Sequence, residues 1–221
     1  MPKDDLHKLF TDADLEAVRA AVREAEARTA GEIVPYVVAA SDVYANALWK
    51  GAAFGALVGP LIALAVYHLE ELWGTHLNLW VSLPAAAGAA AGYLLAALIP
   101  IVRRWLAGDE ILDLRTRQRA EMAFLEQEVF RTRDRTGILI FLSLFEHRVV
   151  VLGDSGINQQ VEQRQWEGIV ADLVTGIRAG RPGAALVEAI RQCGELLERH
   201  GVALQPGDRN ELPDELRRGD S

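Results

Sequence analysis

Acidic residues stand at the ends of three short runs that have the composition of β-strands. Glu32 begins the first run, Glu146 lies in the turn between the second and third runs, and Asp154 follows the third. Hard divalent cations take several oxygen ligands, so carboxylates gathered by neighbouring strand ends could hold Ca²⁺ or Mg²⁺. The sequence therefore predicts Glu32, Glu146 and Asp154 as candidate ligands of one of these cations.

These acids also have a structural interpretation. Turns and helix caps use acidic side chains without any ligand, and Asp154 or Ser155 can close a turn in this way. A strand of about seven residues would also separate Glu146 from Asp154 by about 20 Å. This separation weakens both a metal site and a catalytic site, and both interpretations stay open at this point.

Basic side chains near the same strand ends could bind a phosphate or another anion. The candidates are Arg135, His147 and Arg148. A phosphatase needs, in addition, a nucleophile or a metal-bound water. The sequence has no glycine-rich phosphate cradle, and its CxxxxxR and DxDx spacings, at residues 193–199 and 12–15, fall within expected helices instead of catalytic loops. Binding is therefore easier to derive from these residues than catalysis.

Composition argues against several classes of protein. The 221 residues carry a formal net charge of −8 and no run rich in Lys and Arg, which disfavours nucleic acid as a partner. The single cysteine, Cys193, cannot form an internal disulfide. Residues 1–30 are strongly charged and contain no apolar stretch, so no cleaved secretion signal is expected.

Two long apolar segments predict a transmembrane helical hairpin within residues 46–105. Residues 48–69 and 79–102 are each long enough, as a helix, to cross a hydrocarbon core of about 30 Å. A soluble chain of this size has no room to bury two helices that are apolar all round. The lipid bilayer is therefore the expected surroundings of both segments.

The residues that flank these segments predict their orientation. Lys and Arg next to membrane segments stay on the cytoplasmic side, and the short connection between the segments contains neither. Tryptophan prefers the membrane interface, where its apolar ring contacts lipid and its N–H can donate a hydrogen bond to water. We expect a multi-pass protein of the inner (plasma) membrane with both termini cytoplasmic. The predicted interface residues are Trp49, Lys50, Trp73, Trp80, Arg103, Arg104 and Trp105.

Small residues line one face of the first apolar segment. Gly51, Gly55 and Gly59 recur every four residues, a spacing that lets helix backbones approach closely in lipid. This face either packs against the second segment of the same chain, or forms a homodimer, or binds another protein. Neither segment carries an acid or a base near its centre, so an ion pathway is not expected.

The remaining residues predict one interrupted α/β domain. Residues 1–45 contain one helix and one strand, which cannot form a core alone, so they must complete a sheet supplied by residues 106–204. Residues 205–221 have no apolar period and are predicted to be a disordered tail. The expected helices cover 12–28, 109–133, 161–179 and 182–199, and the expected strands cover 33–39, 138–144 and 149–152.

These pieces resemble the TPM-domain family. The resemblance lies in AVREAEARTAGEIVPYVV, in RAEMAFLEQEVFRTRDRTG leading into GILIFLSL, in EHRVVVLGDSGIN, and in WEGIVADLVTGIRAGRPGAALVEAIRQCGELL. It implies an α/β/α sandwich with a small mixed sheet. In the commoner family pattern the domain lies outside the cytoplasm and precedes a membrane anchor, whereas here the predicted anchor interrupts a cytoplasmic domain.

The sequence thus predicts an integral membrane protein with a cytoplasmic TPM-like domain. Its expected role is non-catalytic: it binds an unidentified membrane-protein partner, or helps to assemble or repair a membrane complex. The alternative is a weak, metal-assisted phosphatase. That activity is implied only by the resemblance, because family members have been assigned both kinds of role.

Overall fold

The computed structural model describes residues 9–69, 77–202 and 211–219. The chain divides into two compact units. The α/β unit consists of Met1–Asp42 together with Leu114–Ser221, and the hairpin unit consists of Val43–Asp113. The hairpin unit is therefore somewhat longer at both ends than the predicted insertion, residues 46–105.

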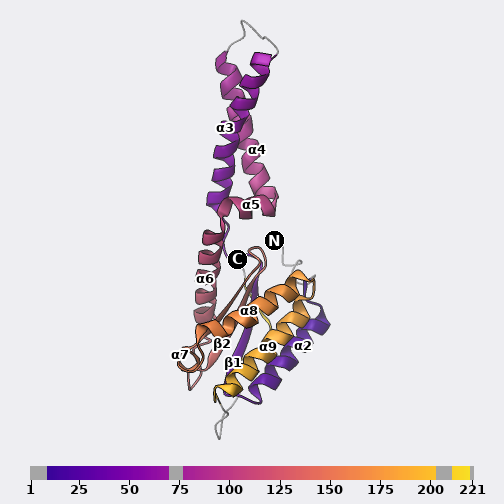
Figure 1. The fold of residues 1–221 in the computed structure, drawn as a ribbon, viewed down its shortest axis with the longest axis vertical. Helices are drawn as coiled ribbons and strands as arrows, with labels where there is room; N and C mark the ends of the chain where they lie inside the picture. The colour runs from indigo at the N-terminus through magenta and orange to yellow at the C-terminus, as the bar shows by residue number, and fades with distance from the viewer. Residues whose placement is uncertain (1–8, 70–76, 203–210, 220–221) are drawn as a thin grey trace. The chain divides into compact units, whose positions relative to one another are not determined.

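A four-stranded mixed sheet forms the centre of the α/β unit (Figure 1). β1 (Glu32–Val38) runs parallel to β2 (Gly137–Ser143) along its whole length. β3 (Arg148–Gly153) runs antiparallel to β2, and the short β4 (Arg217–Gly219) runs parallel to β1. The strand order is β3-β2-β1-β4. The prediction that a strand before the apolar segments completes a sheet formed after them is confirmed.

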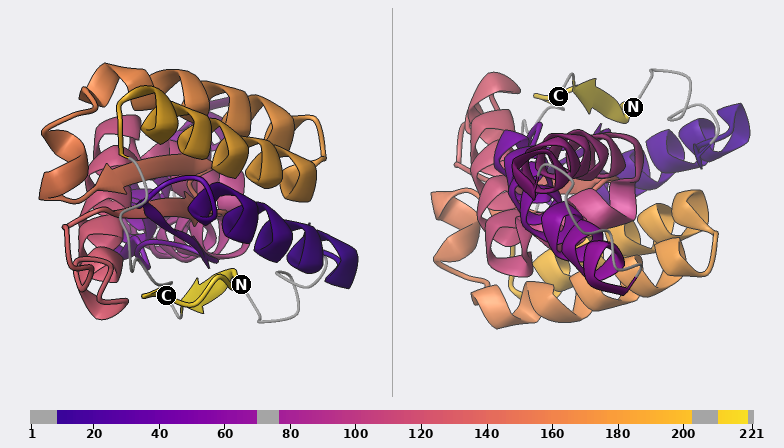
Figure 2. Two further views of the ribbon diagram at one scale, coloured as in Figure 1. Left: turned by 90° about the horizontal axis from the view of Figure 1, so that it is seen from below. Right: turned by 90° about the horizontal axis from the view of Figure 1, so that it is seen from above.

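Helices cover both faces of this sheet. α2 (Asp12–Glu26), α8 (Gln163–Arg178) and α9 (Pro182–Arg199) pack over one face, and Figure 2 shows α8 and α9 in orange to yellow on that side. Ala120 and Ala123 of α6 (Asp109–Glu126) pack over the other face. A single turn, α7 (Ser155–Asn158), follows β3. Because β1 and β2 are buried on both faces, their sequences are continuous apolar runs instead of alternating ones.

Pro35 occupies a position in β1 that tolerates a missing N–H. β4 begins to pair with β1 only at Tyr36, so Pro35 precedes that ladder. The N–H of Ile33, which points to the same edge, donates to the carboxyl group of Glu26 at 3.0 Å. Neither position therefore leaves an unpaired N–H at this edge, although β4 does not pair with this part of β1.

The C-terminal segment differs from its prediction. Its described part, residues 211–219, is ordered against β1 and is not a disordered tail. The Glu32 carboxylate accepts the N–H groups of Glu211 and Leu212 at 3.1 and 3.2 Å, and Leu212 is buried. Ion pairs join Arg19 to Glu215 and Arg23 to Asp214. Backbone pairing and charges hold this segment, and neither produces the apolar period on which the prediction relied.

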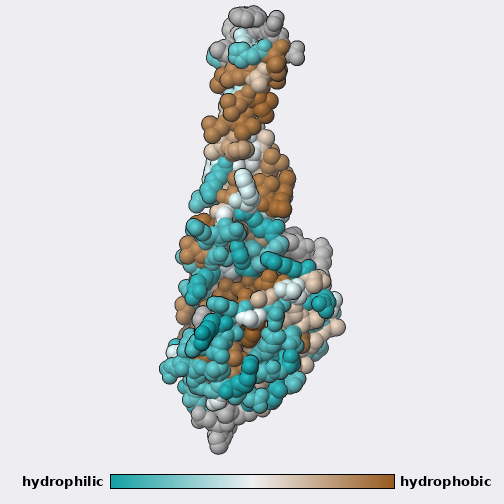
Figure 3. All heavy atoms as spheres, viewed as in Figure 1, coloured by the Kyte–Doolittle hydropathy of each residue, from teal (hydrophilic) through white to brown (hydrophobic). Residues whose placement is uncertain are grey.

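Two helices of the hairpin unit are long and apolar enough to cross a membrane. They are α3 (Ala45–Leu69) and α4 (Leu77–Leu98). Large apolar side chains point outward from both helices, and Figure 3 shows them as brown surface. The exposed large residues include Trp49, Phe54, Leu57, Leu61, Ile62, Leu83, Leu94, Leu95 and Leu98.

The glycine face of α3 packs against α4 of the same chain. A Cβ atom at Gly55 would overlap the carbonyl oxygen of Gly88, and one at Gly51 would press on the backbone of Gly92. Gly59 meets Pro84 in the same way, so the two helices run antiparallel. The structure therefore has the intramolecular alternative, in which the glycine face packs within one chain. A homodimer through the Gly51, Gly55 and Gly59 face would have to displace α4.

The second apolar helix ends earlier than predicted. α4 stops at Leu98, Ile99 is extended, and Pro100 begins a separate helix, α5 (Pro100–Ala107). Proline lacks an N–H group and clashes with the preceding turn, which explains the break. The Nε atom of Arg103 then donates to the carbonyl of Ala96 at 3.1 Å, at the negative end of the α4 dipole. The predicted span 79–102 is therefore wrong at its C-terminal end.

Candidate functional site

The predicted site residues lie at two opposite ends of the sheet. Glu32 and Asp154 lie where β1 and β2 begin, whereas Glu146 lies in the turn between β2 and β3. The register of the β2–β3 hairpin pairs Ile138 with Gly153 at one end and Ser143 with Arg148 at the other. The structure therefore does not bring the three predicted metal ligands together.

Asp154 serves as a cap and as an ion-pair partner. Its carboxylate accepts the N–H of Ser155 at 2.6 Å and caps α7. The Nε atom of Arg135 lies 2.8 Å from its other oxygen. Asp154 is buried, whereas half of the Arg135 side chain is exposed. The structural interpretation of Asp154 thus accounts for its position, and Arg135 is positioned to neutralise it.

Glu26 is a half-buried acid that the sequence pattern does not single out. Burial raises its pKa to about 8, and the nearby carboxylates of Glu32 and Asp214 add to the rise. The N–H of Ile33 donates to its carboxyl group and opposes this shift. Glu26 follows Val22 by four residues on the buried face of α2, which is the one available signal. Its carboxyl group is therefore largely protonated at neutral pH.

No metal site is assembled from the described residues. Within 9–69, 77–202 and 211–219, no group of three or more His, Cys, Asp and Glu side chains could hold a metal ion. Glu32 is engaged by two backbone N–H groups and Asp154 by Arg135 and Ser155. The predicted Ca²⁺ or Mg²⁺ site at Glu32, Glu146 and Asp154 thus has no support in this geometry.

Glu146 ties the end of β2 to the segment that leaves β1. Its carboxylate accepts the N–H of Ser41 at 2.8 Å and the hydroxyl of Ser143. The Ser41 hydroxyl in turn donates to that of Ser143 at 2.8 Å. Glu146 is buried. The burial and bonding of Glu146 therefore fix the β2–β3 turn against the chain that leads on to α3.

His147 and Arg148 line a cavity of about 460 Å³ beside this turn. Arg178, from the last turn of α8, is a third basic residue at the same cavity. The size lies within the range of ordinary ligand pockets. The apolar part of the lining comes from Leu9, Leu142, Leu144, Val149, Val174 and Ile177. Three basic residues beside an apolar wall suit a ligand that joins a negative charge to apolar groups.

The sequence indicates only part of this site. His147 and Arg148 are predicted binding residues, whereas Arg135 lies with Asp154 at the other end of the sheet. Arg178 is not singled out, because a basic residue in the last turn of a helix is ordinary capping chemistry. His147 has a φ of 55°, in the left-handed region, because it closes the tight turn that presents the cavity.

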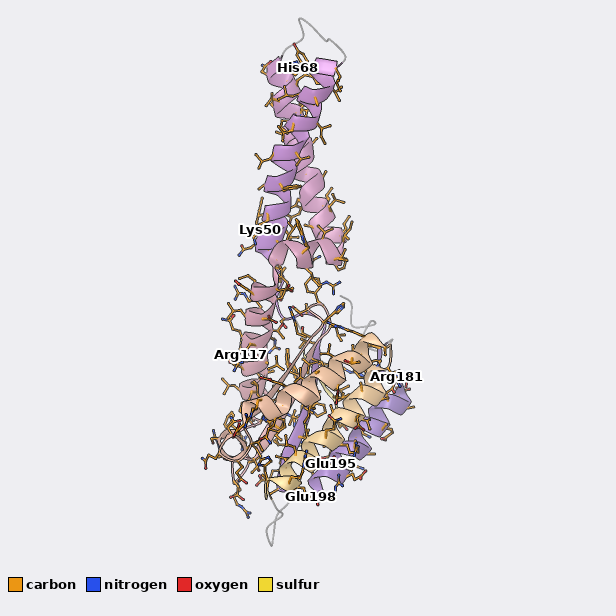
Figure 4. The ribbon with its side chains drawn as sticks, in the orientation of Figure 1. Lys50, His68, Arg117, Arg181, Glu195 and Glu198 are labelled. Carbon is orange, nitrogen blue, oxygen red and sulfur yellow. The ribbon has the colours of Figure 1, made fainter. Side chains whose placement is uncertain are left out.

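The predicted interface residues occupy the hairpin unit. Figure 4 labels Lys50 near one end of the helical pair and His68 near the other. Trp49 and Trp105 are 68% and 76% exposed, and Trp80 makes an edge contact with Tyr67. Arg103 and Arg104 lie on α5 instead of at the end of a continuous span. Trp73 lies outside the described residues.

Comparisons with known proteins give a fold and no function. No model of a protein family matches the chain, and no curated protein matches it. Among solved structures, the NMR structure of the BA42 protein from the psychrophilic bacterium Bizionia argentinensis sp. nov. is similar, with a TM-score of 0.59. The two chains are 18% identical, and the match covers 95% of each. Similarity at this level of identity concerns the fold alone, so the resemblance to the TPM-domain family stays a prediction.

Proposed function

We propose that this protein is a membrane-anchored binding protein. In this proposal α3 and α4 cross the inner membrane, both termini are cytoplasmic, and the α/β unit holds an anionic segment of a membrane-protein partner. The observation that carries the proposal is the cavity that joins His147, Arg148 and Arg178 to an apolar wall. The carboxylates that a metal-assisted phosphatase would need are separated and engaged in fold contacts.

The composition of the hairpin unit supports membrane insertion. α3 and α4 have small residues between them and large apolar residues outside. This distribution suits helices in lipid, where close backbone packing replaces the hydrophobic effect. Lys50 lies near the start of α3, and Arg103 and Arg104 follow the end of α4. These basic residues favour the cytoplasmic side for both ends of the hairpin.

The chain connection supports a partner that is itself in the membrane. Only residues 42–44 separate Ser41, bonded to the turn at Glu146, from the start of α3. An extended chain of this length reaches about 14 Å. A connection this short suits a partner in the same membrane, whose cytoplasmic segments the cavity would bind. An assembly or repair role, as the TPM-like resemblance implies, fits such a partner.

Membrane topology is tested with a cysteine and a reporter. Gly74→Cys is expected to react with a membrane-impermeant thiol reagent in intact cells, and a reporter after Ser221 is expected to be cytoplasmic. Burial raises the pKa of the native Cys193 thiol to about 12, so this residue gives little background. Labelling at the C-terminus and protection at position 74 would contradict the orientation.

Catalysis is tested with phosphate esters. Full-length protein in detergent, with and without added Ca²⁺ and Mg²⁺, is expected to show no hydrolysis above the buffer rate. The variants Glu32→Gln, His147→Ala and Asp154→Asn are expected to leave this result unchanged. Metal-dependent turnover that these substitutions abolish would replace the binding proposal with the phosphatase.

Partner binding is tested by site-specific photo-crosslinking in membranes. A photoreactive residue at Val174, which lines the cavity, is expected to give a discrete adduct. The same residue at Ala171, on the exposed side of α8, is the control. Arg178→Gln should weaken the adduct, whereas Arg164→Gln, on the same helix but outside the cavity, should not. Equal yields at 171 and 174, or no effect of Arg178→Gln, would contradict the proposal.

A further inference from the structure

We infer that the hairpin unit holds an anionic phospholipid of the bilayer in a cavity between α3, α4 and α5. The inference rests on the proposed membrane insertion and adds a specific ligand to it. The cavity has a volume of about 440 Å³ and lies wholly within the hairpin unit. Its walls include Gly51 and Phe54 from α3, Gly92 and Leu95 from α4, and Ile101 and Trp105 from α5.

The cavity results from two features of the sequence. Gly51 and Gly92 let the backbones of α3 and α4 touch, and neither residue has a side chain to fill the space beside this contact. The break at Ile99 and Pro100 then turns the chain, and α5 runs across the foot of the two long helices (Figure 1). The side chains of α5 therefore close one side of a space that a continuous α4 would leave open to its surroundings.

α5 has the character of a helix that lies in a membrane interface. Ile101 and Trp105, four residues apart, are 66% and 76% exposed, and Arg103 and Arg104 lie between them. Helices of this kind place their apolar face at the boundary between acyl chains and headgroups. An open apolar cavity at this depth would hold no water, because its walls offer water almost no hydrogen-bond partners. An acyl chain of a lipid is the apolar group available there.

The charges beside the cavity select an anionic headgroup. Lys50, Arg103 and Arg104 all lie at this end of the helical pair, and residues 45–69 and 77–107 contain no Asp or Glu. The Lys50 ammonium donates to the carbonyl of Leu106 at 3.0 Å, which holds it at the margin of the cavity. Basic residues next to apolar clefts attract phosphate-bearing lipids of the cytoplasmic leaflet. An apolar cavity with a basic margin thus matches one acyl chain and one negative headgroup.

The test measures which lipids stay bound to the full-length protein. Flotation with vesicles first establishes whether the protein enters a bilayer. The protein is then reconstituted in nanodiscs with equal phosphatidylglycerol and phosphatidylcholine and released into mild detergent, and retained lipids are counted by native mass spectrometry. We expect phosphatidylglycerol to exceed phosphatidylcholine by about fivefold or more, the preference that a single basic contact gives.

Matched variants locate the bound lipid. Leu95→Trp fills the cavity and should reduce retained phosphatidylglycerol several-fold, whereas Leu94→Trp should not. These neighbours are equally exposed, at 52% and 53%. Lys50→Gln together with Arg104→Gln should remove the preference for phosphatidylglycerol, and Arg117→Gln on α6 is the charge control. The charge variants leave the cavity walls intact, so they test the inference even if Leu95→Trp fails to fold.

Three outcomes would overturn the inference. Equal retention of the two lipids would reject selection of an anionic headgroup. Equal effects of Leu95→Trp and Leu94→Trp would reject the cavity as the binding site. A protein that does not float with vesicles would contradict membrane insertion itself, and the lipid site would fall with it. Flotation with no lipid preference would leave the proposed function standing and reject only the lipid site.

Discussion

The hairpin unit and the α/β unit distribute their side chains in opposite ways. In the hairpin unit small residues meet at the helix contact, as at Gly55 and Gly88, and Leu57 is 69% exposed. In the α/β unit Leu139 and Phe141 are fully buried. The hydrophobic effect drives the second arrangement but is absent between helices in lipid. The proposed membrane insertion of the hairpin unit would account for this contrast, and each prediction below tests it.

The largest effect is expected from removing the hairpin. Replacement of residues 46–106 by a short Gly/Ser linker should give a protein that is soluble without detergent and unfolds cooperatively. Arg115 and Asp42 form an ion pair at 3.0 Å within the α/β unit, so the two ends left by the deletion already lie close together. A short linker therefore adds little loop entropy.

Solubility and a thermal transition followed by circular dichroism measure this result, with the full-length protein in detergent as the control. An insoluble product, or one without a sharp transition, would show that the α/β core needs the hairpin. The division into two separately built units would then be wrong.

A matched pair of leucines compares the two interiors directly. Leu139→Ala removes a fully buried side chain of β2 and should destabilise the protein by about 2 to 5 kcal/mol. Leu57→Ala removes an outward-facing side chain of α3 and should cost less than about 0.5 kcal/mol in detergent. Denaturant titration in one detergent, followed by the near-ultraviolet signal, measures both. Equal costs would mean that α3 is buried in a protein core.

A smaller effect is expected at the contact between the two long helices. Gly88→Leu places a side chain against the carbonyl of Gly55 and should cost about 1 to 3 kcal/mol through overpacking. Ala87→Leu, next to it on the exposed side of α4, is the control and should be nearly neutral. Thermal stability in detergent measures the loss. Size-exclusion chromatography shows whether the displaced glycine face of α3 then pairs with a second copy, which is the homodimer alternative.

The central strands could be predicted from the sequence, because their apolar runs leave few alternatives. The apolar runs at 33–39 and 138–144 lie within one residue of β1 and β2. Their pairing followed from the argument that one strand and one helix cannot form a core. The two apolar helices were equally evident from length and composition.

The missed features depend on contacts between distant residues. β4 contains Arg217 and Arg218, which carry no strand pattern, and it forms by pairing with the backbone of β1. Arg178 reaches the cavity because α8 packs against the β2–β3 turn, and spacing along α8 does not reveal this. The end of α4 was missed because the apolar composition continues past Pro100, although proline itself marks the break.

The smallest predicted effect concerns pH and is confined to the α/β unit. The pKa of Glu26 is about 8 in the folded protein and 4.5 without burial. Between these two pH values the folded state therefore binds more protons than the unfolded state. The contribution of Glu26 to the free energy of unfolding falls as the pH rises from 4.5 to 8, and it is constant above pH 8. The hairpin helices, residues 45–69 and 77–98, contain no Asp or Glu, so no carboxyl group there adds such a slope.

Glu26→Gln keeps an acceptor for the Ile33 N–H and removes the titration. We expect it to leave the free energy of unfolding nearly unchanged at pH 4.5 and to raise it by about 1 to 2 kcal/mol at pH 9, a discounted fraction of the full shift because the group is only half-buried. Glu24→Gln, at an exposed position two residues earlier, should run parallel to the wild type at every pH. Denaturant titrations at several pH values measure the three curves. If the Glu26→Gln curve also runs parallel to the wild type, the pKa of Glu26 is not raised in the folded protein. The pH response would then no longer distinguish the α/β unit from the hairpin unit.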